Sequence, residues 1–326
     1  MSDARPLRLA MTETRNAYAA MPERIEALPT LADHLDAIRD ANVAHNVALI
    51  EAAAGAGADV VLLSEFCTGP YFALSVQAFW REMAEDAHDG PSVLAFAAAA
   101  ARAGVVVVAP IYERCPRTGE RHDTAVVIDA DGTRLGCYRK LHVPDGTNEQ
   151  ATFSEAFYYR APGEPGPIWR PERNVSRHPL LPVFATAKGR IGVSICYDRH
   201  FDGVHRALAR NGAELVLCPA VTFGAKSERM WWRESEVDAV RHRIFLGVSN
   251  RLGEEAPWNQ PFFGQSHVMG PEGPVSCSRE LAGLVLADVD LATLHAVDPS
   301  GWQLDRDRRD EDYERDLCSP AKPEPR

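Results

Sequence analysis

The sequence lacks the cysteine patterns of metal sites and of disulfide scaffolds. Its 326 residues include seven cysteines, which are scattered, odd in number and never spaced as C-x-x-C. Such a pattern fits neither a zinc site nor a disulfide framework. It is typical of reduced thiols in a cytoplasm, so we expect a cytoplasmic protein.

The sequence also lacks long apolar runs and an excess of basic residues. No run reaches the ~18 apolar residues that a membrane span needs, and residues 1–22 contain no apolar segment of the kind found in secretory signals. Lysine and arginine number 35 against 46 aspartates and glutamates, so the formal net charge is −11. We therefore expect neither a membrane protein nor a general nucleic-acid-binding surface.

Helix-like and strand-like segments alternate along a chain of ordinary globular composition. Each helix-like segment has apolar residues at helical spacing, and the β-branched run after it predicts a buried strand. Three further segments predict hairpins, which together with the alternation indicates an α/β fold with mixed sheets. The helix and strand pairs are 41–57 with 58–66, 91–104 with 105–113, 202–212 with 213–221 and 231–243 with 244–250, and the hairpins are 125–140, 183–196 and 267–279.

No linker or break in composition divides the chain. We therefore expect a single domain over 1–326, with an extended C-terminal tail from about residue 303, where the sequence is charged and rich in proline. The stretch 145–176 is rich in proline, glycine and glutamate and has weak periodicity. Irregular segments of this length are usually functional or mobile.

Three polar residues follow apolar runs at predicted strand ends. Glu65 ends VVLLSEF, Lys140 ends LGCYRK and Cys196 ends IGVSIC. Because ligands of α/β sheets gather outside the strand ends, these side chains are candidates for one site. A carboxylate can take the proton of a thiol, and the thiolate can then attack a carbonyl carbon. Lys140 and the backbone N–H of Tyr197 would hold the resulting oxyanion.

From the residue pattern alone, simpler interpretations stay open. A cysteine at a strand end is more often a small core residue than a nucleophile. A glutamate after a strand is commonly a solvated cap, and a lysine in YRK is commonly a surface charge.

The segments around these residues resemble a known family. SEFCTGPYF, YRKLHVP and GRIGVSICYDRHF, in this order, resemble the three signature segments of the nitrilase superfamily, and the likeness covers most of the chain. The resemblance implies a Glu–Lys–Cys triad at Glu65, Lys140 and Cys196 on a four-layer αββα sandwich. It also implies that no metal or organic cofactor is used, and that two sandwiches pack across their helical faces into a homodimer or a higher homo-oligomer.

The resemblance points to two supporting residues. Many members carry a second glutamate between the lysine and the cysteine, and FSEAFYYRAPGE indicates Glu155, with Glu149 as a rival. This carboxylate would hold Lys140 and orient the attacking water. His142 lies two residues after Lys140, so strand alternation predicts that both side chains share a face. It either orients the triad or is a structural histidine.

Arg199 bears on the substrate. A guanidinium three residues after Cys196 could form a bidentate pair with a substrate carboxylate; the alternative is an ion pair with Asp198 or with the acidic tail. The chain resembles the β-ureidopropionase branch, which implies a carboxylated amide or ureido substrate such as an N-carbamoyl amino acid. The competing hypotheses are an aliphatic amidase, ω-amidase or nitrilase of the same superfamily, and a non-catalytic binding or assembly module on the same fold.

Overall fold

The computed structural model describes residues 6–317. The chain divides into two compact units, Met1–Leu294 and His295–Arg326, and each is described by itself. A tail extended from about residue 303 was expected, but its described part forms helices α6 (Leu304–Asp307) and α7 (Asp310–Leu317). Acidic residues fill the first turn of α7, where they favour a helix N-terminus. Residues 318–326, the end of the expected tail, lie outside the described residues.

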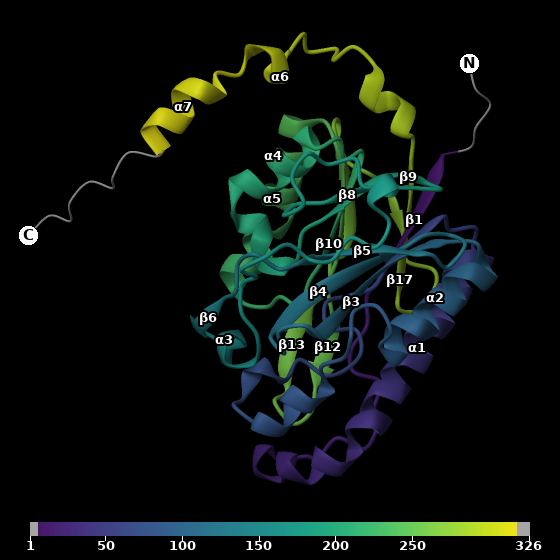
Figure 1. Cartoon of the computed structure of the whole chain (residues 1–326), viewed down its shortest axis with the longest axis vertical. Helices are drawn as coiled ribbons and strands as arrows, with labels where there is room; N and C mark the ends of the chain where they lie inside the picture. The colour runs from purple at the N-terminus through teal and green to yellow at the C-terminus, as the bar shows by residue number, and fades with distance from the viewer. Residues whose placement is uncertain (1–5, 318–326) are drawn as a thin grey trace, which may run out of the picture. The chain divides into compact units, whose positions relative to one another are not determined.

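Two mixed sheets form the centre of the first unit (Figure 1). The larger has the order β16-β17-β1-β2-β3-β4-β5 and the smaller the order β15-β14-β11-β10-β9-β8. The strands of the larger sheet are β1 (Leu7–Thr12), β2 (Val60–Leu62), β3 (Val106–Arg114), β4 (Arg121–Ile128), β5 (Arg134–Arg139), β16 (Cys277–Ser278) and β17 (Leu284–Val289). Those of the smaller are β8 (Val183–Thr186), β9 (Gly189–Val193), β10 (Leu215–Pro219), β11 (Phe245–Ser249), β14 (His267–Gly270) and β15 (Gly273–Pro274).

Helices cover the outer faces of both sheets, which gives the expected four-layer αββα sandwich. Helices α1 and α2 pack on the larger sheet, while α4 and α5 pack on the smaller one (Figure 1). The glycine that follows α2, Gly104, takes the left-handed conformation (φ 67°) common at helix ends. The helices of this unit are α1 (Leu35–Gly55), α2 (Pro91–Ala103), α3 (Glu155–Tyr158), α4 (Asp202–Arg210) and α5 (Ala225–His242).

Side-chain alternation along the strands separates two hydrophobic cores. In β1, Leu9 and Met11 belong to the core that contains residues of both sheets, whereas Ala10 belongs to the core shared with α1 and α2. Burial on both faces explains why these strands read as continuous apolar runs in the sequence. A third, aromatic cluster surrounds Phe66, Tyr71 and Phe72.

Two of the three predicted hairpins form as expected, and the third is only partly correct. Segments 125–140 and 183–196 form β4–β5 and β8–β9. In 267–279, β14 pairs with β15, but β16 pairs with β17 of the larger sheet, because the chain crosses between the sheets there.

The irregular stretch 145–176 contains short elements. These are β6 (Asp145–Thr147), β7 (Thr152–Ser154), α3 and the 3-10 turn η4 (Pro171–Arg173). A separate small hairpin pairs β12 (Leu252–Glu255) with β13 (Gln260–Phe263). Within residues 6–317, no helix combines the length and the apolarity that crossing a membrane requires.

Candidate active site

Strand ends from both sheets meet at one edge of the sandwich. In the larger sheet, Glu65 follows β2 and Lys140 follows β5. Because β4 runs antiparallel to β5, its beginning lies beside the end of β5, and the backbone N–H of Lys140 donates to the carbonyl oxygen of Asp123 (2.9 Å). In the smaller sheet, Cys196 follows β9 and Val221 follows the parallel strand β10. The topology therefore brings five residues, distant in sequence, to one place.

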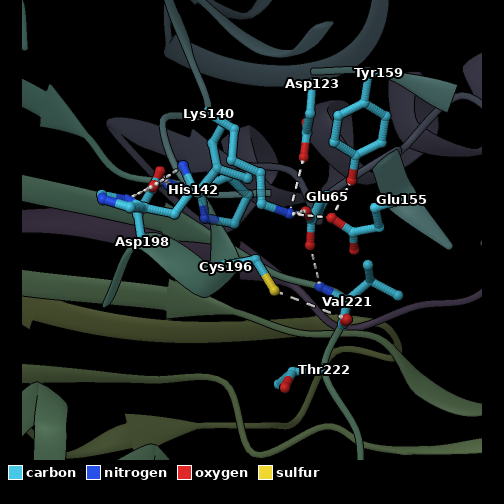
Figure 2. Close-up of polar contacts among 12 residues, drawn as sticks. Glu65, Asp123, Lys140, His142, Glu155, Tyr159, Cys196, Asp198, Val221 and Thr222 are labelled. Carbon is cyan, nitrogen blue, oxygen red and sulfur yellow. Dashed lines mark hydrogen bonds and ion pairs between the residues drawn. The ribbon is translucent and has the colours of Figure 1, made fainter. Parts of the chain in front are cut away.

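The ammonium of Lys140 is surrounded by three buried carboxyl groups (Figure 2). Its Nζ atom donates to Oε1 of Glu65 (2.7 Å) and to Oε2 of Glu155 (2.8 Å). Oδ2 of Asp123 lies farther away, at 3.4 Å. Lys140 is only 1% exposed, so these partners replace the water that a charged ammonium requires.

Glu65 connects this cluster to the cysteine. Its second carboxylate oxygen accepts the backbone N–H of Val221 (2.6 Å), and the carbonyl oxygen of the same Val221 lies 3.9 Å from the Cys196 sulfur (Figure 2). Burial alone would raise the pKa of Glu65. The charge of Lys140, together with hydrogen bonds that include one from the Cys196 thiol, instead lowers this pKa below its usual value. Glu65 is therefore an ionised carboxylate beside a thiol.

Cys196 lies in a strained turn at the end of the strand. It begins the short 3-10 turn η5 (Cys196–His200) with φ 46°, a left-handed conformation that is uncommon for residues other than glycine. Burial raises the pKa of its thiol well above the usual value, and the charge of Glu65 adds to this effect. The resting sulfur thus keeps its proton until a base removes it.

The second glutamate is held by two tyrosines as well as by Lys140. Tyr71 donates its hydroxyl to Oε1 of Glu155 (2.7 Å), and Tyr159 donates to Oε2. Burial raises the pKa of Glu155, although the charge of Lys140 opposes this. The rival, Glu149, instead accepts the backbone N–H of Ala225 at the start of α5. The structure therefore brings Glu155, not Glu149, to the lysine.

A cavity of about 100 Å³ opens beside the sulfur. Cys196, Glu155 and Arg199 all line it, so a small molecule bound there would contact the nucleophile candidate and the guanidinium together. The remaining lining residues are Tyr71, Pro144, Asn148, Phe153, Tyr197, His200, Val221, Thr222, Phe223 and Ser227.

Arg199 is buried against the turn that carries the cysteine. Its Nη1 donates to the carbonyl oxygen of Cys196 (2.8 Å), and its Nη2 makes a long contact with Oγ1 of Thr222 (3.4 Å). Its Nε lies 3.5 Å from Oε2 of Glu234, and its guanidinium carbon lies 4.9 Å from the centre of the Trp231 ring. The carboxylate that the structure places beside the guanidinium is Glu234, and not the expected alternative Asp198.

Comparison with known proteins places this geometry in a family. A family model described as carbon-nitrogen hydrolase matches residues 34–298. The chain belongs to the carbon-nitrogen hydrolase family. It is thus a hydrolase of carbon–nitrogen bonds other than peptide bonds.

Two curated relatives and one solved structure illustrate the likeness. A β-ureidopropionase of Arabidopsis thaliana is 34% identical over 260 residues, which cover 74% of this chain but only 59% of that protein. An N-carbamoylputrescine amidase of Solanum tuberosum is 31% identical over 287 residues, covering 83% of this chain and 88% of that one. The carbon-nitrogen hydrolase of Helicobacter pylori G27 has the same fold, with a TM-score of 0.75, 22% identity and coverage of 95% and 98%.

In this carbon-nitrogen hydrolase, His142 faces away from the lysine cluster (Figure 2). Its Nδ1 contacts Oδ1 of Asp198 at 2.7 Å, and its ring stacks on Phe201. The expectation that Lys140 and His142 share a face does not hold, because β5 ends at Arg139 and strand alternation does not continue beyond it. Of the two interpretations left open for His142, the contacts favour support of the structure around the cysteine turn.

Several residues of the site were not predicted from the sequence. Asp123, Tyr71 and Tyr159 all contact the lysine cluster, and Asp198 holds the cysteine turn. A signal for Asp123 exists in RHDTAVVI, where an acidic residue directly precedes a buried strand core.

Within the part of the chain that the structure describes, no group of three or more His, Cys, Asp or Glu side chains is arranged to hold a metal ion. The centre of the three carboxyl groups is occupied by the Lys140 ammonium. The six cysteines within residues 6–317 are free thiols, and Cys318 lies outside them.

Proposed function

We propose that this enzyme hydrolyses an N-carbamoyl amino acid of the N-carbamoyl-β-alanine type, with Cys196 as nucleophile. The observation that supports this most is that Cys196 and Arg199 line one small cavity. A substrate carboxylate would bind the guanidinium while its carbamoyl carbon lies at the sulfur. Among the described residues that line the cavity, the acidic one is Glu155, which is already bound to Lys140. This favours an anionic substrate tail over the cationic tail of N-carbamoylputrescine.

The first half of the reaction forms a thioester. Glu65 takes the proton of the Cys196 thiol, and the sulfur attacks the carbamoyl carbon. Lys140 stabilises the oxyanion, because it has three N–H donors and only two of them make hydrogen bonds within the cluster. The backbone N–H of Tyr197 is the second donor, since the first N–H groups of a helical turn have no partner inside it. The C–N bond then breaks, and ammonia leaves with the proton that Glu65 returns.

The second half releases the product. Glu65 takes a proton from water, and the hydroxide attacks the thioester carbon, which restores the thiol. Glu155 borders the same cavity and holds Lys140, so it can orient this water. The released carbamate decomposes to amine and carbon dioxide.

A substrate panel scored by ammonia release tests the proposal. The panel contains N-carbamoyl-β-alanine, N-carbamoylputrescine, propionamide and a simple nitrile, and we expect the highest kcat/KM with the first. Turnover of propionamide, the nitrile or N-carbamoylputrescine with none of N-carbamoyl-β-alanine would reject the anionic-tail assignment. The C196A and C196S variants are expected to lose turnover. Retained turnover would exclude the cysteine mechanism, and a wild type inactive on every compound would favour the non-catalytic binding module.

Replacing Arg199 tests directly whether this residue binds the carboxylate of the substrate. R199K keeps the charge but loses the planar fork that matches a carboxylate. We expect kcat/KM for N-carbamoyl-β-alanine to fall about 10- to 100-fold, the range for loss of a charge-assisted hydrogen bond. Propionamide has no carboxylate and serves as the matched control for damage to the cysteine turn. Equal losses on both substrates would assign Arg199 to that turn alone.

Cytoplasmic location and homo-oligomeric assembly stay predictions. Light scattering can test the assembly.

A further inference from the structure

Asp123 is the acidic residue of the lysine cluster that has the fewest hydrogen-bond donors. Glu65 accepts from Lys140 and from the backbone of Val221, and Glu155 accepts from Lys140 and two tyrosines. Neither carboxyl oxygen of Asp123 accepts a hydrogen bond from any group among residues 6–317. Its Oδ2 lies 3.4 Å from Lys140 Nζ, at ion-pair distance only.

The charges of the cluster do not balance if all four groups are ionised. Three carboxylates and one ammonium would leave a net charge of −2 in a site where each of these residues is at most 1% exposed. Uncompensated buried charge is strongly unfavourable, so such groups take up a proton instead. Since donors stabilise the ionised forms of Glu65 and Glu155, the proton belongs on the group without donors.

We propose that Asp123 is a neutral carboxylic acid that donates its hydrogen to Glu65, and that it thereby keeps Glu65 ionised as the base for Cys196. Both carboxyl groups contact the same Lys140 ammonium, Glu65 at 2.7 Å and Asp123 at 3.4 Å, and a hydrogen bond between the two side chains contributes to the pKa of each. Two carboxylates could each only accept, so this contact requires a proton on one of them. Asp123 is then a positioning residue that acts through Glu65.

The electrostatics of the site agree with this assignment. Burial raises the pKa of Asp123 well above its usual value, and the charge of Glu65 raises it further. The pKa of Glu65 moves the opposite way. When the environment moves the pKa values of two neighbouring carboxyl groups apart in this manner, one group serves as acid and the other as base. A neutral Asp123 also leaves the third N–H of Lys140 free for an oxyanion.

Infrared spectroscopy tests the assignment without any turnover. The carbonyl band of a neutral carboxylic acid is distinct from the bands of carboxylates, and D123N removes it if Asp123 carries the proton at pH 7. E155Q is the matched control in the same cluster, because Glu155 has the same burial and also contacts Lys140. We expect the band to disappear in D123N and to persist in E155Q. Its persistence in D123N would overturn the proposal.

Kinetics provide a second test. The direction in which the pH profile of kcat/KM moves separates a neutral Asp123 from an ionised one. The acidic limb of kcat/KM against pH reports the base of the free enzyme. Removing a neutral donor in D123A destabilises the Glu65 carboxylate, so the limb should move to higher pH, with kcat falling about 10- to 100-fold. D123N keeps an N–H donor, so the acidic limb should stay in place and kcat should fall no more than about threefold. If Asp123 were ionised, removing its negative charge would move the limb to lower pH in both variants.

The groups that face Asp123 are Glu65, Lys140, Glu155 and Tyr159, and D123N and D123A alter none of them. The kinetic test rests on the proposed function, and it uses whichever compound of the panel the wild type hydrolyses fastest. The infrared test does not rest on the proposed function. A protein that hydrolysed nothing in the panel would reject the proposed function, while the infrared band would still decide the charge state of Asp123.

Discussion

Arg251, at the end of β11, donates a hydrogen bond from its guanidinium to the backbone carbonyl oxygen of Glu65 (3.1 Å), far away in the sequence. The same Nη2 atom also donates to the carbonyl oxygens of Phe66 (2.7 Å) and Gly69 (2.9 Å). Glu255 pairs with this arginine and accepts the backbone N–H of Tyr71 (2.9 Å). One buried ion pair therefore holds both Glu65 and the tyrosine that binds Glu155.

We expect R251K to damage activity more than stability. Lysine keeps the charge, but its compact ammonium does not reproduce the planar fork that reaches Glu255 and three carbonyl oxygens. The position of Glu65 should relax, and kcat/KM should fall at least about 10-fold, since small displacements of catalytic groups have large effects. R251M breaks the buried pair and should lower the free energy of unfolding by about 3–5 kcal/mol in urea titrations.

The exposed pair of Arg102 and Glu51 provides the matched control. R102M should change the free energy of unfolding by at most ~1 kcal/mol, as is usual for surface ion pairs. An R251K enzyme with wild-type kcat/KM would show that Arg251 does not position Glu65.

Asp198 connects the strand of Lys140 with the turn of Cys196. Its Oδ2 accepts from the Tyr138 hydroxyl (2.6 Å) and from the backbone N–H of Ile195 (3.0 Å). Its Oδ1 accepts from the backbone N–H of His142 (3.0 Å) and contacts Nδ1 of the same residue. D198N replaces one acceptor oxygen with a donor group, so the backbone N–H of either Ile195 or His142 then faces a donor.

We therefore expect D198N to lower the free energy of unfolding by about 2–3 kcal/mol, measured by urea titration, because unsatisfied buried polar groups are costly. H142A removes only one of the four contacts, and the side chain that makes it is 30% exposed, so we expect a smaller loss of under ~1.5 kcal/mol. A D198N protein as stable as the wild type would show that this carboxylate does not hold the end of β5 and the cysteine turn together.

The sequence indicated the three proposed catalytic residues but not the groups that surround them. Glu65, Lys140 and Cys196 each end an apolar run, and the parallel course of β2 and β3 and of β9 and β10 brings such ends together. Asp123 lies near the start of β4 instead, where its only signal is the apolar run that follows it, and an acidic residue at such a place is normally solvated. Its burial depends on β4 lying between β3 and β5, and on α3 covering the site, neither of which local periodicity encodes. Lys140 and His142 do not share a face for a similar reason: β5 ends at Arg139, before both residues.

Alkylation by iodoacetamide should distinguish the thiols of Cys115 and Cys196, because their pKa values are shifted in opposite directions. Hydrogen bonds from Thr118 and Arg117, and from Arg139, lower the pKa of Cys115 despite its desolvation. Cys196 has a raised pKa, so its reactivity depends on Glu65 taking the proton. At neutral pH we expect Cys115 to react first in the wild type.

In a C115A background, Cys196 should then react well ahead of Cys67 and Cys218, whose pKa values burial raises. Adding E65Q should slow Cys196 at least about 10-fold, because the base is lost. Peptide mass spectrometry measures each site, and the partly exposed Cys277 serves as the internal reference. Equal rates for Cys196 with and without Glu65 would contradict its role as base.

The stability of D123N should depend on pH with a sign that reports the native charge of Asp123. Its pKa is raised in the folded protein, so between the unfolded value of about 3.9 and the folded value the native state holds a proton that the unfolded state has lost. Wild-type stability then falls as pH rises through this window. D123N has no such proton, so its stability relative to the wild type should increase from about pH 4 to about pH 7.

Asp131, in the exposed turn between β4 and β5, is the control of opposite sign. A hydrogen bond from the backbone N–H of Thr133 lowers its pKa, so the wild type gains stability as pH rises towards the unfolded value of about 3.9 and keeps this gain above it. The stability of D131N relative to the wild type should therefore fall as pH rises to about 4 and stay constant from about pH 4 to about pH 7. Urea midpoints at several pH values measure both variants. Parallel trends for D123N and D131N would mean that Asp123 is ionised in the native protein, and the neutral-acid assignment would fail.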